Sequence, residues 1–135
     1  MGTSCLFCEI KDFYLENSFA YAIYDNFPVT KYHTLVIPKR HIDNYFDLTQ
    51  KEITDIHDLL CQQKENLVKK DLTITGFNIG INCGKDAGQT IFHCHIHLIP
   101  RRMGDVENPV GGVRNVIQGK GDYRIRTQKT DYETV

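Results

Sequence analysis

The alternation of hydrophobic and polar residues predicts four short strands. Two of them are apolar runs that end at turn-forming residues, namely the stretch from Asp25 to Pro28 and the single Pro38. The other two alternate apolar with small or polar residues, which is typical of strands that present one face to a core. The predicted strands are residues 19–24 (FAYAIY), 33–38 (HTLVIP), 75–84 (TGFNIGINCG) and 91–99 (IFHCHIHLI).

One stretch carries a helical pattern. Thr49 and Glu52 form a T-x-x-E capping box, in which each side chain satisfies a free backbone N–H at the helix start. The helix is predicted to end near Lys70, with His57 solvated on its charged face. Strands before and after one helix predict an α+β fold with a mainly antiparallel sheet. The apolar positions at helical spacing are Ile53, Ile56, Leu60 and Leu67.

Three of the six histidines fall within five positions of the last predicted strand. His93, His95 and His97 share one face of that strand, because side chains alternate between faces. Packing alone does not explain three imidazoles in a row, since each buried ring nitrogen needs a partner. A neutral imidazole can attack phosphorus and form a covalent intermediate, and a neighbouring histidine can protonate the leaving group. His95, flanked on both sides, is the predicted nucleophile, and the residues predicted to face the core are Phe92, Cys94, Ile96 and Leu98.

The loop before these histidines has groups that suit a phosphate. Gly84 and Gly88 let the backbone approach a ligand and point N–H groups at it. Gln89 and Thr90 add side-chain donors. Alone, the loop would be interpreted as a hairpin turn, but beside the histidines it predicts an anion site.

A metal site is the competing interpretation of the histidines. Cys5 and Cys8 have the C-x-x-C spacing of a zinc knuckle, which supplies two of the four ligands that zinc needs. His33, His41 or one of the three clustered histidines would complete it. Alternatively, all three clustered histidines would hold a hydrolytic zinc and leave the cysteines without a metal. Spacing alone leaves both possibilities open.

Composition narrows the class of protein. The chain has 135 residues, enough for one domain, and a net charge of −1 gives no general argument for binding nucleic acid or an anionic membrane. No apolar run approaches the ~20 residues of a membrane span, and no secretory signal is recognisable. A cytoplasmic location is expected, with the five cysteines as thiols or metal ligands. The Gly-rich, charged sequence after Arg102 cannot build a core, and we expect one domain over residues 1–119 and a tail over 120–135.

The sequence HCHIHLI at 93–99 resembles the H-φ-H-φ-H-φ-φ signature, with φ apolar, of the histidine triad (HIT) family of nucleotide hydrolases and transferases. Cys94 is a mild departure, since cysteine packs as a small apolar residue. The resemblance covers roughly residues 4–105 and includes HTLVIPKRHI at 33–42 and NCGKDAGQT at 82–90. It implies a five-stranded antiparallel sheet with two helices, one of them around residues 5–13. It also implies a homodimer with a ten-stranded sheet.

The resemblance implies a role for each residue of the site. His95 is expected to accept the nucleotidyl α-phosphate, His97 to hydrogen-bond the phosphate, and His33 and His93 to orient the site. The resemblance also implies that Asn82, Gln89 and Thr90 contact the phosphates or the leaving group. It implies that Asp25 binds the ribose hydroxyls, and that the purine base lies between Phe7, Ile10 and Ile23.

Most members that begin with C-x-x-C resemble galactose-1-phosphate uridylyltransferase in holding a structural zinc. Here the resemblance implies Cys5, Cys8, His41 and His93 as the zinc ligands. The first clustered histidine then serves the metal, and the metal fixes the strand that carries His95.

Two branches of the family differ in the leaving group. Hint-like members hydrolyse nucleoside phosphoramidates and usually have serine where Thr90 stands, whereas Fhit-like members cleave dinucleoside polyphosphates. The sequences AGQT at 87–90 and IPRRMGD at 99–105 resemble the Fhit-like pattern, which favours dinucleoside polyphosphates with adenosine as the base. Phosphoramidate hydrolysis is the alternative, and a nucleotide-binding regulatory protein with little turnover is a second. Candidates for holding the extra phosphates are Arg101, Arg102 and Arg114.

Overall fold

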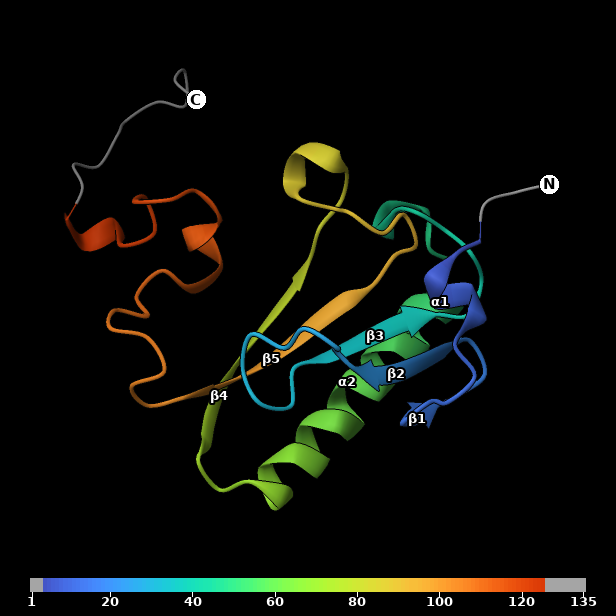
Figure 1. The fold of residues 1–135 in the computed structure, drawn as a ribbon, viewed down its shortest axis with the longest axis horizontal. Coiled ribbons are helices and arrows are strands. Elements are labelled where there is room, and N and C mark those ends of the chain that lie inside the picture. The colour runs from blue at the N-terminus through green and yellow to red at the C-terminus, as the bar shows by residue number, and fades with distance from the viewer. Residues whose placement is uncertain (1–3, 126–135) are drawn as a thin grey trace. The chain divides into compact units, whose positions relative to one another are not determined.

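The computed structural model describes residues 4–125 of the chain. Five strands form one antiparallel sheet in the order β1-β2-β3-β5-β4, accompanied by two α-helices (Figure 1). This confirms the predicted α+β fold with a five-stranded antiparallel sheet and two helices. The elements are α1 (Leu6–Glu9), β1 (Leu15–Glu16), β2 (Ala20–Tyr24), β3 (Thr34–Pro38), α2 (Gln50–Lys70), β4 (Ile74–Ile81) and β5 (Ile96–Arg102).

Helix α2 begins and ends where its sequence predicts. The Thr49 hydroxyl accepts a hydrogen bond from the Glu52 N–H at 3.1 Å, and the Glu52 carboxylate accepts one from the Thr49 N–H at 2.9 Å. The capping box is therefore formed, and two backbone donors that no helical carbonyl can reach are satisfied. His57 is exposed on the outer face of the helix, as predicted.

The two faces of the sheet carry separate apolar clusters. Ile56 and Leu59 of α2 pack against one face, together with alanines and Val36 of β2 and β3. Tyr21, Leu35 and Ile37 of the same strands form the other cluster with Phe7 of α1. Because neighbouring residues of a strand point to opposite faces, the sheet separates the α2 core from the face that α1 covers. The histidine of β5, His97, pairs with Leu35 and therefore lies on the α1 face.

Strand β5 begins later than predicted. Residues 91–95 are not in a strand, although Cys94, Ile96 and Leu98 keep the alternating burial. The carbonyl of Pro38, at the end of β3, accepts a hydrogen bond from the His93 ring at 2.7 Å. The chain here is therefore held by this side-chain bond and by one backbone bond, from the Cys94 N–H to the Ile42 carbonyl, in place of a strand ladder. The prediction of Phe92 as a core residue is wrong, because its side chain is 48% exposed.

Two N-terminal elements also differ from the expectation. Strand β1 was not predicted, because two residues are too few to show a period. Helix α1 spans only four residues, where the resemblance implies a helix around residues 5–13. Its first turn is nevertheless closed by the Cys8 N–H, which donates to the Cys5 carbonyl at 3.1 Å.

The chain divides into two compact units, residues 1–103 and 104–135. In the described part of the second unit, two short 3-10 turns span Gly112–Val116 and Tyr123–Ile125. The Arg114 guanidinium donates to the Gly121 carbonyl at 3.0 Å. The apolar side chains of this unit are largely exposed, as expected of a segment without a core. The predicted boundary at residue 119 stays a prediction, and residues 126–135 of the predicted tail lie outside the described residues.

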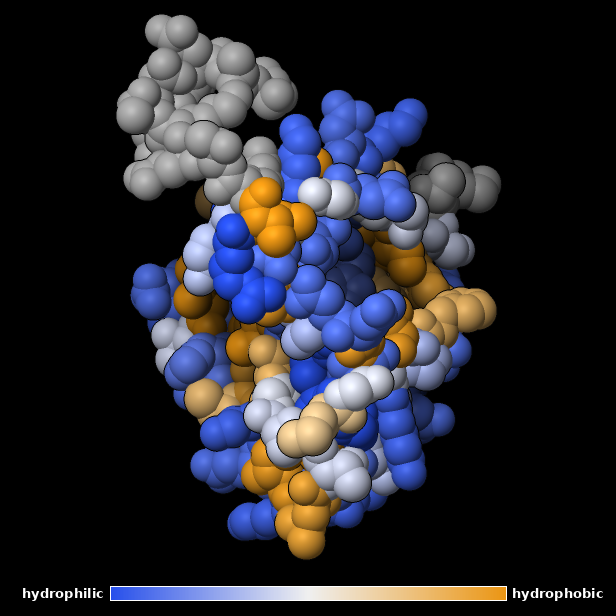
Figure 2. Space-filling view, turned by 90° about the vertical axis from the view of Figure 1, so that its left-hand side faces the viewer, coloured by the Kyte–Doolittle hydropathy of each residue, from blue (hydrophilic) through white to orange (hydrophobic). Residues whose placement is uncertain are grey.

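The face of the molecule in Figure 2 is mostly hydrophilic, and its hydrophobic residues appear in small separate patches. Within residues 4–125, no helix is both long enough and apolar enough to span a membrane.

Candidate active site and metal site

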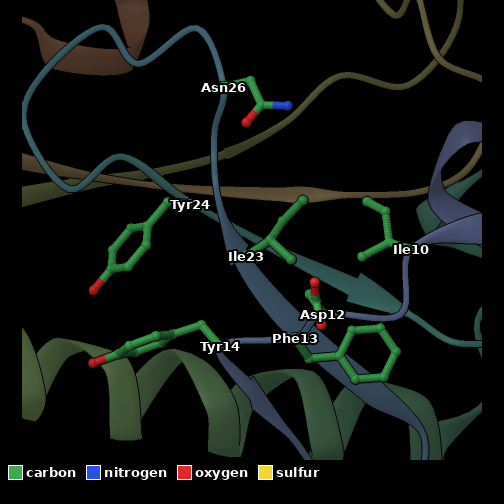
Figure 3. A pocket seen from close by; sticks show the side chains of 7 residues that line it. All are labelled: Ile10, Asp12, Phe13, Tyr14, Ile23, Tyr24 and Asn26. Atoms are coloured by element: carbon green, nitrogen blue, oxygen red, sulfur yellow. The ribbon is translucent and has the colours of Figure 1, made fainter.

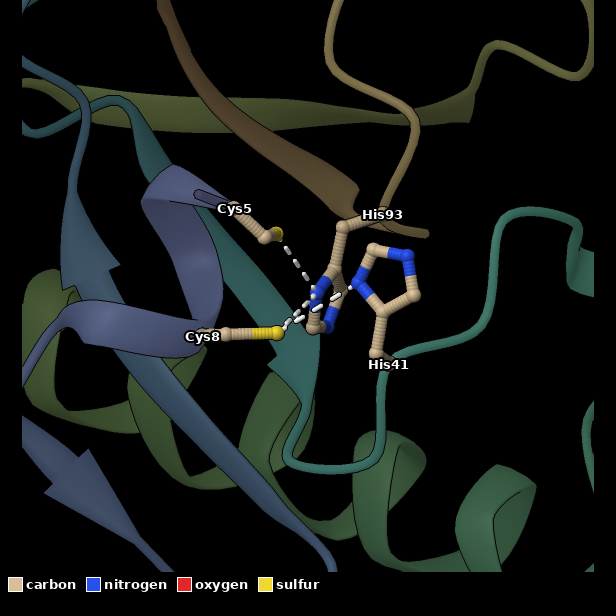
Figure 4. Close-up of side chains that lie close together, drawn as sticks. All are labelled: Cys5, Cys8, His41 and His93. Carbon is tan, nitrogen blue, oxygen red and sulfur yellow. Dashed lines mark hydrogen bonds between the residues drawn. The ribbon is translucent and has the colours of Figure 1, made fainter. Parts of the chain in front are cut away.

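Two cysteines and two histidines converge beside α1, as Figure 4 shows. The Cys5 and Cys8 sulfurs lie 3.3 and 3.4 Å from His93 Nδ1, and the Cys8 sulfur lies 3.4 Å from His41 Nδ1. All four ligand-type atoms lie within 4.8 Å of one another. The structure thus brings together the four residues that the resemblance implied as zinc ligands.

The donor set fits a tetrahedral zinc ion. With bonds of about 2.3 Å to sulfur and 2.0 Å to nitrogen, neighbouring ligand atoms around zinc lie roughly 3.5 Å apart, close to the distances found here. His93 is fully buried, and its Nε2–H donates to the Pro38 carbonyl at 2.7 Å. Its Nδ1 therefore carries the lone pair that faces the thiols, and burial lowers the pKa of His93, which keeps the ring neutral.

Three chain segments position these ligands. Cys5 and Cys8 flank the first turn of α1, and His41 follows the end of β3. The Cys94 N–H donates to the Ile42 carbonyl at 2.7 Å, which holds the segment of His41 against that of His93. On the exposed side, His41 Nε2 lies 3.6 Å from an Asp43 carboxylate oxygen. A hollow of about 450 Å³, lined by Cys5, His41 and Asp43 among others, lies beside the cluster.

The His95 ring is oriented by a backbone carbonyl. Its Nδ1 lies 2.8 Å from the carbonyl oxygen of His93, which can only accept a hydrogen bond. Nδ1 must therefore carry the proton, and Nε2 keeps the free lone pair of a nucleophile. The Phe7 ring packs edge-on against His95, with 5.1 Å between ring centroids. This contact limits rotation of the imidazole.

A chain of hydrogen bonds also fixes the protons of His33 and His97. The Val29 N–H donates to His33 Nδ1 at 3.1 Å, so His33 carries its proton on Nε2. His33 Nε2 lies 2.9 Å from His97 Nδ1 and donates its hydrogen to it, so His97 in turn carries its proton on Nε2. Burial, and to a smaller extent the nearby His95 and His33, lower the pKa of His97 to about 4. His97 is therefore a neutral N–H donor at neutral pH.

His33 is neutral for the same main reason. Burial lowers its pKa, and the opposing effect of Asp25, whose carboxylate oxygen lies 3.6 Å from His33 Nε2, is smaller. Both ring nitrogens of His33 are engaged, which disfavours a metal between Asp25, His33 and His97 although their ligand-type atoms lie close together. The alternative of a three-histidine zinc centre is not supported either. The Nδ1 atoms of His93, His95 and His97 have separate partners, and no potential metal cluster in residues 4–125 contains all three.

The glycine-containing loop is held together by Gln89. The Gln89 carbonyl oxygen accepts from the Gly84 N–H at 2.8 Å, and its amide nitrogen donates to the Asp43 and Ile91 carbonyls. Gly84 and Gly88 have φ values of 95° and 93°, which only glycine adopts at low cost. The amide of Gln89 is therefore fully used in shaping the loop, whereas Thr90 is exposed at its end. The predicted phosphate contacts of Gln89, Thr90 and Asn82 stay predictions.

A groove of about 420 Å³ lies along β2 and the extended segment before β1 (Figure 3). It includes Ile10 and Ile23, two of the three residues that the resemblance implied at the base. Its volume is within the roughly 300–1,000 Å³ of small-molecule sites. Phe7, the third residue implied at the base, is 4% exposed and packs beside His95, so it does not line this groove. The lining residues that sequence reasoning missed are Asp12, Phe13, Tyr14, Tyr24 and Asn26.

A model of the HIT domain matches residues 9–104. The chain belongs to the HIT domain family. This HIT-domain chain is 37% identical over 97 residues to the bis(5'-adenosyl)-triphosphatase of Dictyostelium discoideum, a match that covers 72% of this chain and 64% of that protein. It is 40% identical over 78 residues to the asymmetrical bis(5'-nucleosyl)-tetraphosphatase of Schizosaccharomyces pombe, a match that covers 58% of this chain and 42% of that protein. The crystal structure of a Zn-bound histidine triad family protein from Mycobacterium smegmatis superposes with a TM-score of 0.66 and 37% identity, covering 76% and 78%.

The three arginines expected to hold the extra phosphates have partners within their own units of the chain, and the role of Arg101 and Arg114 at the phosphates stays a prediction. Arg102 pairs with Asp71 at 2.9 Å and donates to the Lys31 carbonyl, and Arg101 donates to Asn78. Arg102 is seven residues beyond His95, about 20 Å along an extended chain. Within one chain, it is therefore too far from the nucleophile to hold a phosphate next to the one that reacts. The Arg114 guanidinium donates to a backbone carbonyl of its own unit.

Proposed function

We propose that this HIT-domain protein hydrolyses dinucleoside polyphosphates through a covalent nucleotidyl intermediate on His95. The observation that carries the proposal is the hydrogen bond between His95 Nδ1 and the His93 carbonyl, which leaves the Nε2 lone pair available. In the first step, Nε2 forms a bond to the α-phosphorus and the bond to the bridging oxygen breaks. In the second, water attacks the same phosphorus, frees Nε2 and releases a nucleoside monophosphate.

His97 stabilises the charge that develops on the phosphate. Its Nε2–H is fixed by the hydrogen bond from His33, and its ring centroid lies 5.2 Å from that of His95. A neutral N–H so placed donates a hydrogen bond to a phosphoryl oxygen without giving up its proton. His33 acts through His97 and is a positioning residue. Asp25, beside His33, is proposed to hold the ribose hydroxyls.

The protonation of the site favours phosphoanhydride over phosphoramidate substrates. A nucleoside polyphosphate leaves as a stable anion, since terminal phosphates have a pKa near 6 and need no proton at neutral pH. An amine leaving from a phosphoramidate must take up a proton. His97, whose pKa is lowered to about 4, does not carry an extra proton to give. The two polyphosphatase relatives support the same choice.

Zinc is proposed as a structural ion held by Cys5, Cys8, His41 and His93. When bound, it would join α1 to the segments after β3 and before β5, and it takes no part in the steps above. The proposal is supported by the fit of the four donor atoms and by the Zn-bound neighbour.

A homodimer and a cytoplasmic location stay proposals. β4 is an edge strand of the sheet, so its free edge suits the pairing of two sheets into one of ten strands.

The test is to trap the intermediate. Full-length protein is mixed with diadenosine tetraphosphate, quenched within the first turnover, and measured by intact mass spectrometry for one added adenylyl group. His95→Ala should show no adduct and lose at least about 10³-fold in turnover. His57→Ala, which changes an exposed histidine on α2, should behave like the wild type. Adenosine phosphoramidate should give slower adduct formation. An adduct on the His95→Ala protein, or turnover without a wild-type adduct, would contradict the mechanism.

A further inference from the structure

The groove beside Ile23 contains a carboxylate without a partner. The Asp12 side chain is exposed, and among residues 4–125 it makes no hydrogen bond or ion pair. It nevertheless lines the same groove as Ile10 and Ile23. An acceptor of this kind at an apolar site fixes the orientation and identity of a ligand more than its affinity.

Figure 3 shows how the groove is laid out. Asn26 lies on one side of Ile23, and Asp12 lies on the other side with Phe13. Asn26 follows Asp25, the proposed ribose contact. A base whose sugar is held at that end and which lies between Ile10 and Ile23 directs its far edge toward Asp12. In a purine, the edge far from the sugar is the Watson–Crick edge.

We propose that Asp12 selects guanine as the base of the bound nucleotide. The inference rests on the proposed function, because it assumes that the groove holds the base, and it replaces the adenosine that the family resemblance implies with guanosine. Guanine presents two adjacent donors on its Watson–Crick edge, N1–H and the N2 amino group. A carboxylate has two acceptor oxygens in one plane and binds such a pair in a bidentate manner, as it binds the two N–H groups of an arginine.

Adenine does not match the same carboxylate. Its Watson–Crick edge places the N1 lone pair beside the N6 amino group, so one carboxylate oxygen accepts a hydrogen bond while the other faces a lone pair. An amide has one acceptor and one donor and therefore matches the N6 amino group and the N1 lone pair of adenine better. Asp12→Asn should consequently shift the preference from guanine toward adenine, instead of only weakening the binding of guanine.

The experiment measures binding of GMP and AMP to the full chain by isothermal titration calorimetry. Because Asp12 is open to water, we expect GMP to bind about tenfold more tightly than AMP, less than a buried charged pair would give. In Asp12→Asn, GMP should bind about tenfold more weakly and AMP at least as tightly as before. Asp58→Asn, the same change at an exposed position of α2, should keep the wild-type ratio.

Parallel assays with diguanosine and diadenosine tetraphosphate separate this inference from the proposed function. Equal binding of GMP and AMP, or a ratio that persists in Asp12→Asn, would overturn the selection of guanine and leave the hydrolytic proposal intact. A ratio that changes as expected without any hydrolysis would support Asp12 and refute the hydrolase. Failure of both monophosphates to bind would overturn the selection of guanine, and hydrolysis of the two tetraphosphates would still decide the proposed function.

Discussion

Glu52 links the start of α2 to the segment that carries His41, and replacing it with glutamine should cost substantial stability. Its carboxylate accepts hydrogen bonds from two nitrogens of Arg40, at 2.8 and 3.0 Å, and from the Thr49 N–H at 2.9 Å. Its side chain is only 3% exposed. Glutamine keeps the capping acceptor, since it also serves in capping boxes, but removes the charge opposite Arg40.

The expected loss follows from the pKa of the carboxyl group. The hydrogen bonds from Arg40, and then that from Thr49, lower the pKa of Glu52 from 4.5 to about 2 despite the opposing effect of burial. A shift of this size corresponds to about 3 kcal/mol. Because the Arg40 side chain is 49% exposed, water screens part of the interaction. We therefore expect Glu52→Gln to lower the free energy of unfolding at neutral pH by about 2–3 kcal/mol.

The loss should depend on pH in one direction. A carboxyl group whose folded-state pKa is lowered contributes stability above its ordinary pKa, 4.5, and loses it as the pH falls toward about 2. The difference in unfolding free energy between wild type and Glu52→Gln should thus be constant near neutral pH and shrink below pH 4.5. Other carboxyl groups titrate in both proteins, so the difference isolates Glu52.

Urea unfolding followed by circular dichroism measures these free energies. The matched control is Glu16→Gln, because Glu16 pairs with Lys39 at 2.7 Å but its side chain is 53% exposed. Such a surface pair should contribute about 0.5 kcal/mol or less. Similar losses for the two variants, or a Glu52→Gln loss that does not diminish in acid, would refute the reasoning from burial and pKa.

Two further predictions concern the metal site and the loop. Elemental analysis should find roughly one zinc per chain in the wild type, and Cys5→Ser should lose it, because a hydroxyl is a poor zinc ligand. The control Cys61→Ser, on α2, should retain the zinc. An absence of zinc from wild-type protein prepared without chelators would contradict the site. Gln89→Ala leaves the Gly84 N–H and two carbonyls without their partner, and should lower the unfolding free energy by about 2 kcal/mol, against little change for the exposed Gln62→Ala. Equal losses in these two glutamine variants would show that the amide of Gln89 does not hold the loop.

Local patterns in the sequence predicted the elements that depend on interactions between residues close together in the chain. The capping box and helical spacing placed α2 within a residue at its start, because caps and apolar spacing act within a few residues. β2 and β3 were predicted from apolar runs ended by prolines and turn residues. The start of β5 was predicted too early, because an alternating pattern indicates which face a side chain takes but not whether the backbone pairs with a neighbouring strand.

The pairings within the site depend on the fold and were beyond the reach of spacing. His33 and His97 are 64 residues apart, and only the antiparallel pairing of β3 with β5 brings them together. The resemblance to a known family supplied these residues. It gave no reason to choose Asp12, whose proposed role comes from lying next to Ile23 in the folded chain.

His93 connects the cysteine–histidine cluster to the proposed active site. Its ring is held at both nitrogens, by the Pro38 carbonyl and by the cysteine sulfurs, while its own carbonyl orients the proposed nucleophile, His95. A ring held at both ends restricts the rotation of its backbone, and a restricted backbone fixes the direction of that carbonyl. The carbonyl is common to every residue type, so the sequence gave no sign of it. If His95 is the nucleophile as proposed, we therefore expect the side chain at position 93 to act on it by holding its own backbone, so that the orientation of His95 depends on the integrity of the cysteine–histidine cluster.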